Sequence, residues 1–348
     1  MTAAHPQRST VTGLRSRGEA YALNQLIIGT RASRLALWQT NWVAQQLRAL
    51  HPHIEIVIRT ITTKGDTHTD TPLPKIGAKG LFTREIEAAL VAGEIHCAVH
   101  SLKDLPTDSI VIASREAAKQ SPNRESEIAS SRQPLLAMTH PLIVAAITER
   151  EDARDVLISR LNLGLDRLPR GARIGTSSLR RAAQLRAYRS DLHIVNLRGN
   201  VDTRLRKAET EEYDAIVLAA AGVLRLGFAD RITEFLPFDV MLPAPGQGAL
   251  AVQARADDAA TLALVAPLEH APTRAATTAE RAFLRALGGG CQVPVAAYGE
   301  VNGNTLHLRG LVASEDGARV VRGQVRGAVE QAEALGEELA RMLNISRP

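Results

Sequence analysis

One of the chain's two cysteines follows three consecutive glycines, in the stretch LGGGCQVPV at residues 287–295. A structural cysteine is usually a small buried hydrophobe. Gly288, Gly289 and Gly290 instead favour an exposed loop in which a large group can approach the Cys291 sulfur. The stretch alone leaves two interpretations open, a reactive thiol or a loop bend that happens to carry a cysteine.

Basic residues gather in two stretches, SSLRRAAQLRAYR and NLRGNVDTRLRK, although the formal net charge is only +5. Guanidinium groups bind carboxylates and phosphates through paired hydrogen bonds. Nucleic acid is one possible target. Aromatic residues make up only 3% of the chain, however, and none alternates with the arginines to offer a stacking platform. A small polyanionic ligand fits these clusters at least as well.

The composition indicates a globular protein of two or three domains, with 348 residues, 45% hydrophobic and 23% charged. Two cysteines make no disulfide framework, which favours a reducing compartment. No run approaches the ~18 apolar residues of a membrane span. Arg8, Arg15 and Arg17 give the N-terminus a faint likeness to a transit peptide, but a disordered tail is the preferred interpretation. We therefore expect a cytoplasmic protein, with an organelle as the alternative.

Strands alternate with helices along most of the chain, in one series from residue 23 and another from about residue 150. This predicts a mostly parallel, doubly wound α/β sheet, built twice. In the first expected helix, Leu35, Trp38 and Trp42 share a face. Three strand-like runs then follow one another between residues 293 and 327, before a helix expected at about 328–343. They predict a small antiparallel α+β domain.

Ligands of open α/β sheets bind beyond the carboxyl ends of the strands. The polar residues expected there are Arg31, Ser33, Ser101, Lys103, Asp104, Thr176, Ser177, Ser178, Arg180, Arg181, Arg198, Asn200 and Arg204. We therefore expect two domains that face each other across an anion-binding cleft, with the carboxylate of Asp104 among the cations. The alternatives are a solvated helix face for Arg180 and Arg181, and a simple turn before Pro106 for Asp104.

The stretch HCAVH invites a zinc site made by His96, Cys97 and His100. Strand alternation would place Cys97 on the face opposite the two histidines, and no second pair of ligands follows. We therefore predict no metal site.

Taken together, eight motifs resemble the porphobilinogen deaminase family, also called hydroxymethylbilane synthases. They are TRASRLALWQ, KIGAKGLFTREIE, AVHSLKDLPT, IGTSSLRRAAQL, LRGNVDTRL, YDAIVLAAAGVLRLG, PAPGQGAL and GGGCQVPV. The resemblance runs from about Gln25 to the C-terminus with one insert. It implies a transferase of tetrapyrrole biosynthesis, the route to heme and chlorophyll. Such an enzyme joins four porphobilinogen molecules to a dipyrromethane cofactor with loss of ammonia, and then hydrolyses off linear hydroxymethylbilane.

Carried over residue by residue, the resemblance implies a thioether between the cofactor and Cys291. It also implies that Asp104 is catalytic, its carboxylate stabilising the positive charge that develops on deamination. The other implied cofactor-binding residues are Lys103, Ser33, Ser178, Arg180, Arg181, Arg204 and Asn200. The implied substrate-binding residues are Arg31, Arg198, Arg225, Ser101, Lys75, Lys79, Phe82 and Thr176. No metal is implied.

The resemblance also implies two domains like those of periplasmic binding proteins, with crossovers between them, and a third domain that carries the cofactor loop on a small three-stranded antiparallel sheet. The expected limits are 1–20 for a flexible extension, 20–148 and 249–266 for domain 1, 150–245 for domain 2 and 271–348 for domain 3. An insert is expected at about 110–141. SIVIAS before it and PLIVAAI after it compete for one strand of domain 1. The family precedent is a monomer.

Two other classes compete with this interpretation. A solute-binding protein would share the two-domain cleft without chemistry, but would leave Cys291 and Asp104 unexplained. A nucleic-acid-binding protein would show steep salt dependence of DNA binding.

Overall fold

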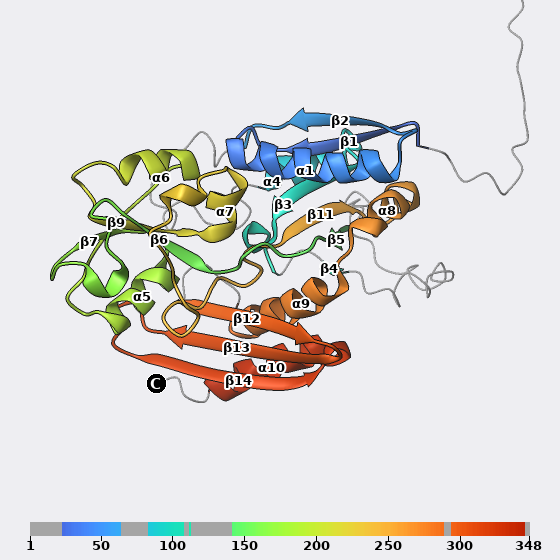
Figure 1. Cartoon of the computed structure of the whole chain (residues 1–348). Coiled ribbons are helices and arrows are strands. Elements are labelled where there is room, and N and C mark those ends of the chain that lie inside the picture. Colours follow the sequence, from blue (N-terminus) through green and yellow to red (C-terminus); the bar gives the residue numbers. More distant parts are fainter. Residues whose placement is uncertain (1–22, 64–82, 108–110, 113–140, 289–293, 345–348) are drawn as a thin grey trace, which may run out of the picture.

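The computed structural model describes residues 23–63, 83–107, 111–112, 141–288 and 294–344. Two α/β lobes lie side by side, and a third unit lies beneath them with its strands running across the foot of both (Figure 1). Among the described residues, no helix is long and apolar enough to cross a membrane. The expected N-terminal extension and most of the expected insert lie outside the described residues, and the domain limits stay predictions.

The sheet of the first lobe has the strand order β2-β1-β3-β11-β5-β4. Five of its strands are parallel, and β11 runs antiparallel to its neighbours β3 and β5. The strands are β1 (Gln25–Thr30), β2 (Glu55–Thr60), β3 (Cys97–Ser101), β4 (Val111–Ile112), β5 (Leu142–Ile147) and β11 (Leu250–Arg255). Its helices are α1 (Arg34–Leu50), α4 (Arg84–Val91) and α8 (Ala259–Val265).

The second lobe repeats this plan with the order β10-β6-β9-β7-β8, in which β6 alone is antiparallel to its neighbours. The strands are β6 (Asp155–Ser159), β7 (Arg173–Gly175), β8 (His193–Val195), β9 (Ala215–Ala219) and β10 (Glu234–Phe235). Its helices are α5 (Leu179–Tyr188), α6 (Val201–Lys207) and α7 (Ala220–Arg225). The expectation of two doubly wound sheets is confirmed. In each sheet the antiparallel strand is the one that arrives from the other lobe. The chain passes between the lobes twice, in a first crossing, residues 148–154 between β5 and β6, and in a second crossing, residues 236–249 between β10 and β11.

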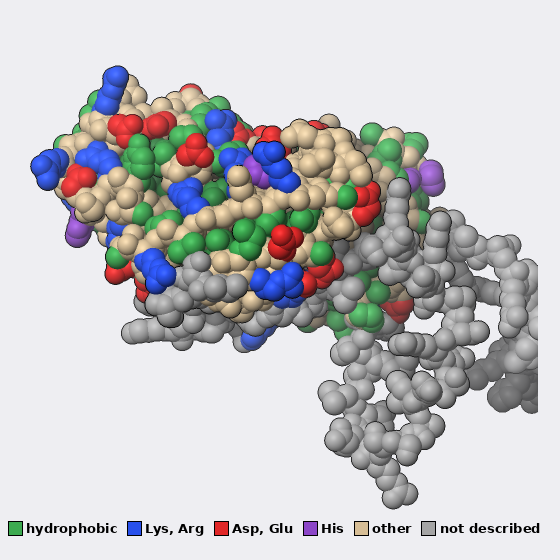
Figure 2. Space-filling view, turned by 90° about the horizontal axis from the view of Figure 1, so that it is seen from below, with side chains coloured by type: hydrophobic (Ala, Val, Ile, Leu, Met, Phe, Trp, Pro, Cys, Tyr) green, Lys and Arg blue, Asp and Glu red, His purple; other side chains and the backbone are tan. Residues whose placement is uncertain are grey.

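The third unit is an antiparallel sheet, β12 (Val295–Asn302), β13 (Thr305–Ala313) and β14 (Val320–Ala328), as predicted. Helices α9 (Ala271–Ala286) and α10 (Ala332–Asn344) cover one of its faces around the fully buried Phe283 and Leu339. The other face packs on the second lobe, where Leu311 joins Ala183 and Leu242 in one apolar cluster. Figure 2 views the molecule from this end, and basic, acidic and hydrophobic side chains are interspersed over the visible surface.

Three local expectations change with the structure. SIVIAS and PLIVAAI do not compete, because β4 and β5 pair in parallel in the same sheet. The sequence also predicts a helix over TTAERAFLRAL, residues 277–287, and in the structure this helix, α9, begins earlier, at Ala271, with Pro272 in its first turn, where proline is tolerated. In α1 the deeply buried residues include Val43 and Leu47, whereas the face of Leu35, Trp38 and Trp42 is only partly buried.

Candidate active site

A cavity of about 90 Å³ lies between the two lobes. Its lining includes five of the predicted site residues, namely Ser101, Lys103, Arg181, Arg204 and Arg225. The other lining residues are Leu35, Gln39, Val201, Leu218, Ala219, Ala221, Gly222, Gln247, Gly248 and Ala249. Because residues of both lobes and of the second crossing contribute, closing or opening the lobes changes this cavity.

A larger open groove of about 320 Å³ lies on the outer side of the second lobe. Three of its four charged lining side chains are paired, with 2.7 Å between Arg231 and Glu209 and 3.2 Å between Arg160 and the neighbouring Asp214. The cavity between the lobes, where cations outnumber carboxylates, is therefore the better candidate for an anionic ligand.

Lys103 and Asp104 follow β3 on a single 3₁₀ turn, Leu102–Asp104, and both side chains are exposed. Loss of hydration lowers the pKa of the Lys103 ammonium to about 8, although part of the side chain stays accessible. Asp104 and Asp155 oppose this by raising the pKa, and Arg181 and Arg180 add to it.

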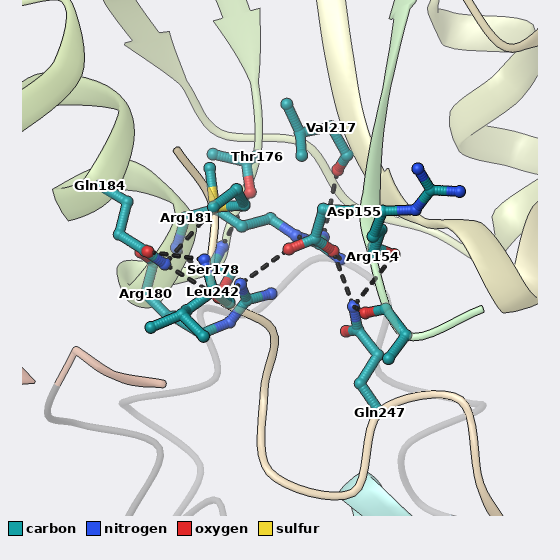
Figure 3. Close-up of polar contacts among 12 residues, drawn as sticks. Arg154, Asp155, Thr176, Ser178, Arg180, Arg181, Gln184, Val217, Leu242 and Gln247 are labelled. Carbon is teal, nitrogen blue, oxygen red and sulfur yellow. Dashed lines mark hydrogen bonds and ion pairs between the residues drawn. The ribbon is translucent and has the colours of Figure 1, made fainter. Parts of the chain in front are cut away.

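Helix α5 presents two adjacent arginines at its first turn (Figure 3). Its N-cap Ser178 accepts a hydrogen bond from the backbone N–H of Arg181 at 3.4 Å, and this bond fixes the start of the helix. Arg180 and Arg181 are 7% and 6% exposed, and both form ion pairs at 2.7 Å with the fully buried Asp155. The interpretation of these arginines as a solvated helix face is therefore wrong.

Asp155 is held ionised by this arrangement. Burial alone would raise its pKa, but the two guanidinium groups outweigh burial and hold the pKa of the carboxyl well below its usual range. Gln247, on the second crossing, donates from Nε2 to Asp155 at 3.0 Å and to the carbonyl of Ala153 at 2.8 Å. Its Oε1 accepts from Lys103 Nζ at 3.3 Å. Hydrogen bonds thus link the buried arginines of the second lobe to Lys103 of the first.

Arg204 and Arg225 bring two further cations to the cavity. Arg204 donates to the carbonyl of Gly199, and Arg225 to that of Gly248, both at 2.7 Å. The guanidinium of Arg225 also lies over the ring of Trp38, 5.9 Å from its centroid. Burial lowers the pKa of each arginine to about 10. At both arginines, the loss of hydration outweighs the attraction of the neighbouring carboxylate.

None of the other predicted residues that the structure describes belongs to the lining of this cavity. Asp104 and Arg198 are close enough to Arg204 to act on its pKa, Asp104 raising it and Arg198 lowering it. The remaining positions are the partly buried Arg31 after β1, the N-caps Ser33 and Asn200, and the buried Thr176, which accepts from the N–H of Ser178. Lys75, Lys79, Phe82 and Cys291 lie outside the described residues.

Helix α9 contributes two buried residues that the sequence analysis did not single out. Arg281 donates to the carbonyls of Leu105 at 3.0 Å and Pro106 at 2.8 Å, directly behind the turn of Lys103 and Asp104. Glu280 receives both terminal nitrogens of Arg150, at 2.6 and 3.2 Å. The signal was present in the sequence, because a charged pair interrupts the apolar run of Ala279, Ala282 and Phe283, which helical periodicity buries.

Cys97 is the one cysteine among the described residues, and it is a poor nucleophile. It lies on β3 in the core of the first lobe with no exposed surface, and burial raises the pKa of its thiol to about 12. Among the described residues there is also no group of three or more His, Cys, Asp and Glu side chains placed to hold a metal ion.

Two lobes joined by two crossings, with incompletely neutralised cations in the cavity between them, are the arrangement of a protein suited to an anionic ligand. Comparison with known proteins identifies which one: the chain belongs to the porphobilinogen deaminase family. The family model described as "Porphobilinogen deaminase, dipyromethane cofactor binding domain" matches residues 26–127 and 128–263, and the model of the C-terminal domain matches residues 275–344. The resemblance inferred from the motifs is confirmed.

Individual relatives agree with the family match. The porphobilinogen deaminase of Syntrophotalea carbinolica is 51% identical over 318 residues, which cover 91% of this chain and 92% of that protein. The porphobilinogen deaminase of Carboxydothermus hydrogenoformans is 48% identical over 92% of this chain and 93% of that protein. Among solved structures, the aliphatic sulphonate binding protein SsuA of Escherichia coli has a TM-score of 0.36 at 14% identity, over 76% of this chain and 70% of that one. That score is too low to add to the topology described above.

Proposed function

We propose that this protein is a hydroxymethylbilane synthase that carries its dipyrromethane on Cys291. It joins four porphobilinogen molecules in a linear chain, releases one ammonia for each, and frees the tetrapyrrole by hydrolysis. The observation that carries the proposal is the set of incompletely neutralised cations between the lobes, next to the carboxylate of Asp104, in a member of this family.

The chemistry of the cleft fits a dipyrromethane, whose pyrrole rings bear acetate and propionate groups. Loss of hydration has lowered the pKa of Lys103, Arg204 and Arg225. A ligand carboxylate would stabilise their charged forms in place of the lost water. When bound, the dipyrromethane supplies the pyrrole carbon to which the first porphobilinogen is joined. The proposed binding residues for it are Lys103, Ser33, Ser178, Arg180, Arg181, Arg204 and Asn200.

Asp104 is the proposed catalytic carboxylate. It lies on the turn after β3 among cations, so its oxygens can accept a hydrogen bond from a pyrrole N–H and stabilise positive charge as ammonia leaves. The proposed substrate-binding residues are Arg31, Arg198, Arg225, Ser101, Lys75, Lys79, Phe82 and Thr176. They would bind the carboxylates and ring of porphobilinogen while Asp104 acts at its nitrogen.

The test is the intact mass of the purified protein, followed by peptide mapping of any adduct. We expect a dipyrromethane-sized increment on the peptide of Cys291, its loss in Cys291→Ala, and its retention in Cys97→Ala, which removes the buried thiol. An adduct on Cys97 would overturn the assignment of the attachment site. A thiol that stays unmodified after incubation with porphobilinogen would favour a solute-binding protein.

We further propose a cytoplasmic monomer that takes porphobilinogen as its small-molecule partner and binds neither nucleic acid nor membrane. The bacterial relatives and the small number of cysteines support this placement. Light scattering of the purified protein tests the oligomeric state. The N-terminal residue of protein isolated from cells tests the alternative of an organelle, because removal of the extension would indicate a transit peptide.

A further inference from the structure

Asp155 is a buried carboxylate on which three cleft side chains converge (Figure 3). It accepts hydrogen bonds from Arg180 Nη1 at 2.7 Å, from Arg181 Nη2 at 2.7 Å and Nε at 3.1 Å, and from Gln247 Nε2 at 3.0 Å. It has no exposed surface, so a ligand in the cavity does not reach it. Any effect of Asp155 on the ligand must act through these three partners.

The carboxylate fixes the orientation of both guanidinium groups. Arg181 also donates from Nη1 to the carbonyl of Val217, and Arg180 from Nη1 to that of Leu242. One carboxylate between two arginines leaves the cluster with one net positive charge. Arg181 reaches the cavity lining, and three of its five N–H groups donate to Asp155 and Val217.

The same carboxylate acts on the opposite lobe through Gln247. Because Nε2 of Gln247 donates to Asp155 and to the carbonyl of Ala153, its Oε1 is turned toward Lys103 Nζ, 3.3 Å away. An amide without these acceptors could rotate and present its NH₂ group to the ammonium instead. Asp155 thus selects the amide orientation that binds a cation.

We infer that Asp155 is a positioning residue of the cleft, which holds Arg180 and Arg181 on one lobe and, through Gln247, the ammonium of Lys103 on the other. The inference rests on the proposed function for what these cations bind. The hydrogen bonds themselves are independent of that function, so the effect of Asp155 on Lys103 can be measured without catalysis.

The first measurement is the pH dependence of Lys103 acetylation, read by peptide mapping with a trace of acetic anhydride. The charged groups that face Lys103 are Asp104 on its own turn, Arg180 and Arg181 on α5, and Asp155 on β6. Of these, Asp104 and Asp155 raise the pKa of Lys103, and the two arginines lower it. In Asp155→Asn we expect the midpoint of acetylation to move to lower pH by about 0.5 to 1 unit.

Asp214 provides a matched control, because it too is a carboxylate held by two arginines. It accepts from Arg173 at 3.3 Å and from Arg160 at 3.2 Å. In the β6–β9 pair, Asp155 lies beside Ala219 and Ser159 lies beside Ala215. Asp214 immediately precedes Ala215, so it lies at the other end of this pair from Asp155. Asp214→Asn should leave the acetylation midpoint of Lys103 unchanged, whereas a general loss of stability would be shared by both variants.

The second measurement is cofactor loading and steady-state kinetics. Asp155→Asn should lower the fraction of protein that carries the adduct and raise KM for porphobilinogen by about tenfold or more, which one lost charged hydrogen-bond partner commonly costs. Asp214→Asn should change neither. Gln247→Met removes the hydrogen bonds of the Gln247 amide with Lys103, Asp155 and the carbonyl of Ala153 but removes no buried charge, so it decides the question if Asp155→Asn does not fold.

An acetylation midpoint that stays in place in both Asp155→Asn and Gln247→Met would overturn the inference, as would an equal shift in Asp214→Asn. Failure of the proposed function is a separate result, in which wild-type protein carries no adduct and does not consume porphobilinogen. The acetylation profile still reports on Asp155 in that case.

Discussion

At the scale of single residues, two pairs of arginines differ in the direction in which the folded protein shifts their pKa. Arg173 and Arg189 lie near the surface, and the hydrogen bonds that they donate to the carboxylates of Asp214 and Asp191 raise the pKa of each. In the cleft, burial lowers the pKa of Arg204 and Arg225 instead. The first kind is already neutralised within the protein, so only the second is free to gain stabilisation from an anionic ligand.

Replacing Asp104 tests the proposed chemistry directly. In Asp104→Asn we expect kcat to fall by about 10²- to 10³-fold, the usual effect of removing one electrostatic contact to the transition state. KM and the dipyrromethane adduct should change little. The thermal midpoint should stay the same, because the side chain is exposed.

Steady-state kinetics and intact mass check this prediction, with Asp104→Glu as the control that keeps the charge. Turnover by Asp104→Asn within a few-fold of wild type would contradict the role of the carboxylate.

His100 predicts a pH dependence of stability. It is buried on β3, and burial lowers its pKa from 6.5 to about 4, with a smaller contribution from Arg31 and an opposing hydrogen bond from Gln253. Between these two pH values the unfolded chain binds a proton that the folded protein does not, so stability falls as the pH falls. The loss amounts to roughly 3 kcal/mol over this range.

Urea unfolding at several pH values measures this loss. In His100→Gln the slope between pH 6.5 and 4 should be shallower than in wild type, while His53→Gln, at an exposed position, should keep the wild-type slope. Parallel curves for wild type and His100→Gln would contradict the prediction.

At the scale of elements, α9 connects the third unit to the two crossings and to the turn of Lys103 and Asp104. Two neighbouring residues do this, since Arg281 binds the carbonyls behind the Asp104 turn and Glu280 binds Arg150 of the first crossing. Glu280 also accepts from the backbone N–H of Gly246, on the second crossing, and of Gly299, on β12. The helix therefore holds both crossings and the turn of Lys103 and Asp104 in fixed positions relative to one another.

Removing the Arg281 guanidinium should make the turn of Lys103 and Asp104 more mobile. In Arg281→Met we expect kcat to fall by about tenfold with a smaller change in KM. Leaving a buried carbonyl without its hydrogen-bond donor costs about 1–3 kcal/mol, and the turn can avoid this cost by shifting until the carbonyls reach water. The matched control is Arg285→Met on the same helix, where the arginine pairs at the surface with Glu333. Equal kinetics in the two variants would contradict the positioning effect.

The sequence predicted the elements of this site better than their contacts. Ser33 and Ser178 as N-caps follow from local rules, and the order of strands and helices placed Lys103 and Arg181 at the same cleft. Asp155 and Gln247 could not be found this way. They are 92 residues apart and meet only because the two crossings run side by side, and a buried aspartate in a strand has no local signature.

At the scale of the whole molecule, the two crossings contact each other through a glycine. Gly248 has φ = +93°, and a Cβ there would overlap the carbonyl oxygen of Glu151 on the other crossing. Gly171 has a similar φ of +75° with nothing within 4 Å of such a Cβ. Comparing substitutions at the two glycines therefore separates the cost of the backbone conformation from the cost of the contact between the crossings.

We expect Gly171→Ala to lower the free energy of unfolding by about 1–2 kcal/mol, the cost of a left-handed conformation. Gly248→Ala should lose at least about 3 kcal/mol, because the crossings must also move apart. Urea unfolding of both variants measures the difference. Similar losses in the two would show that the crossings are free to separate.

The position of β11 sets the order in which this chain can fold. Residues 250–255 lie between β3 and β5 in the first sheet, so both of those strands keep an unpaired edge until the whole second lobe has left the ribosome. Open edges invite pairing with other chains, and contacts between distant residues form slowly. The first lobe to be synthesised is therefore the last to be completed, and its exposed edges depend on the speed of translation through the second.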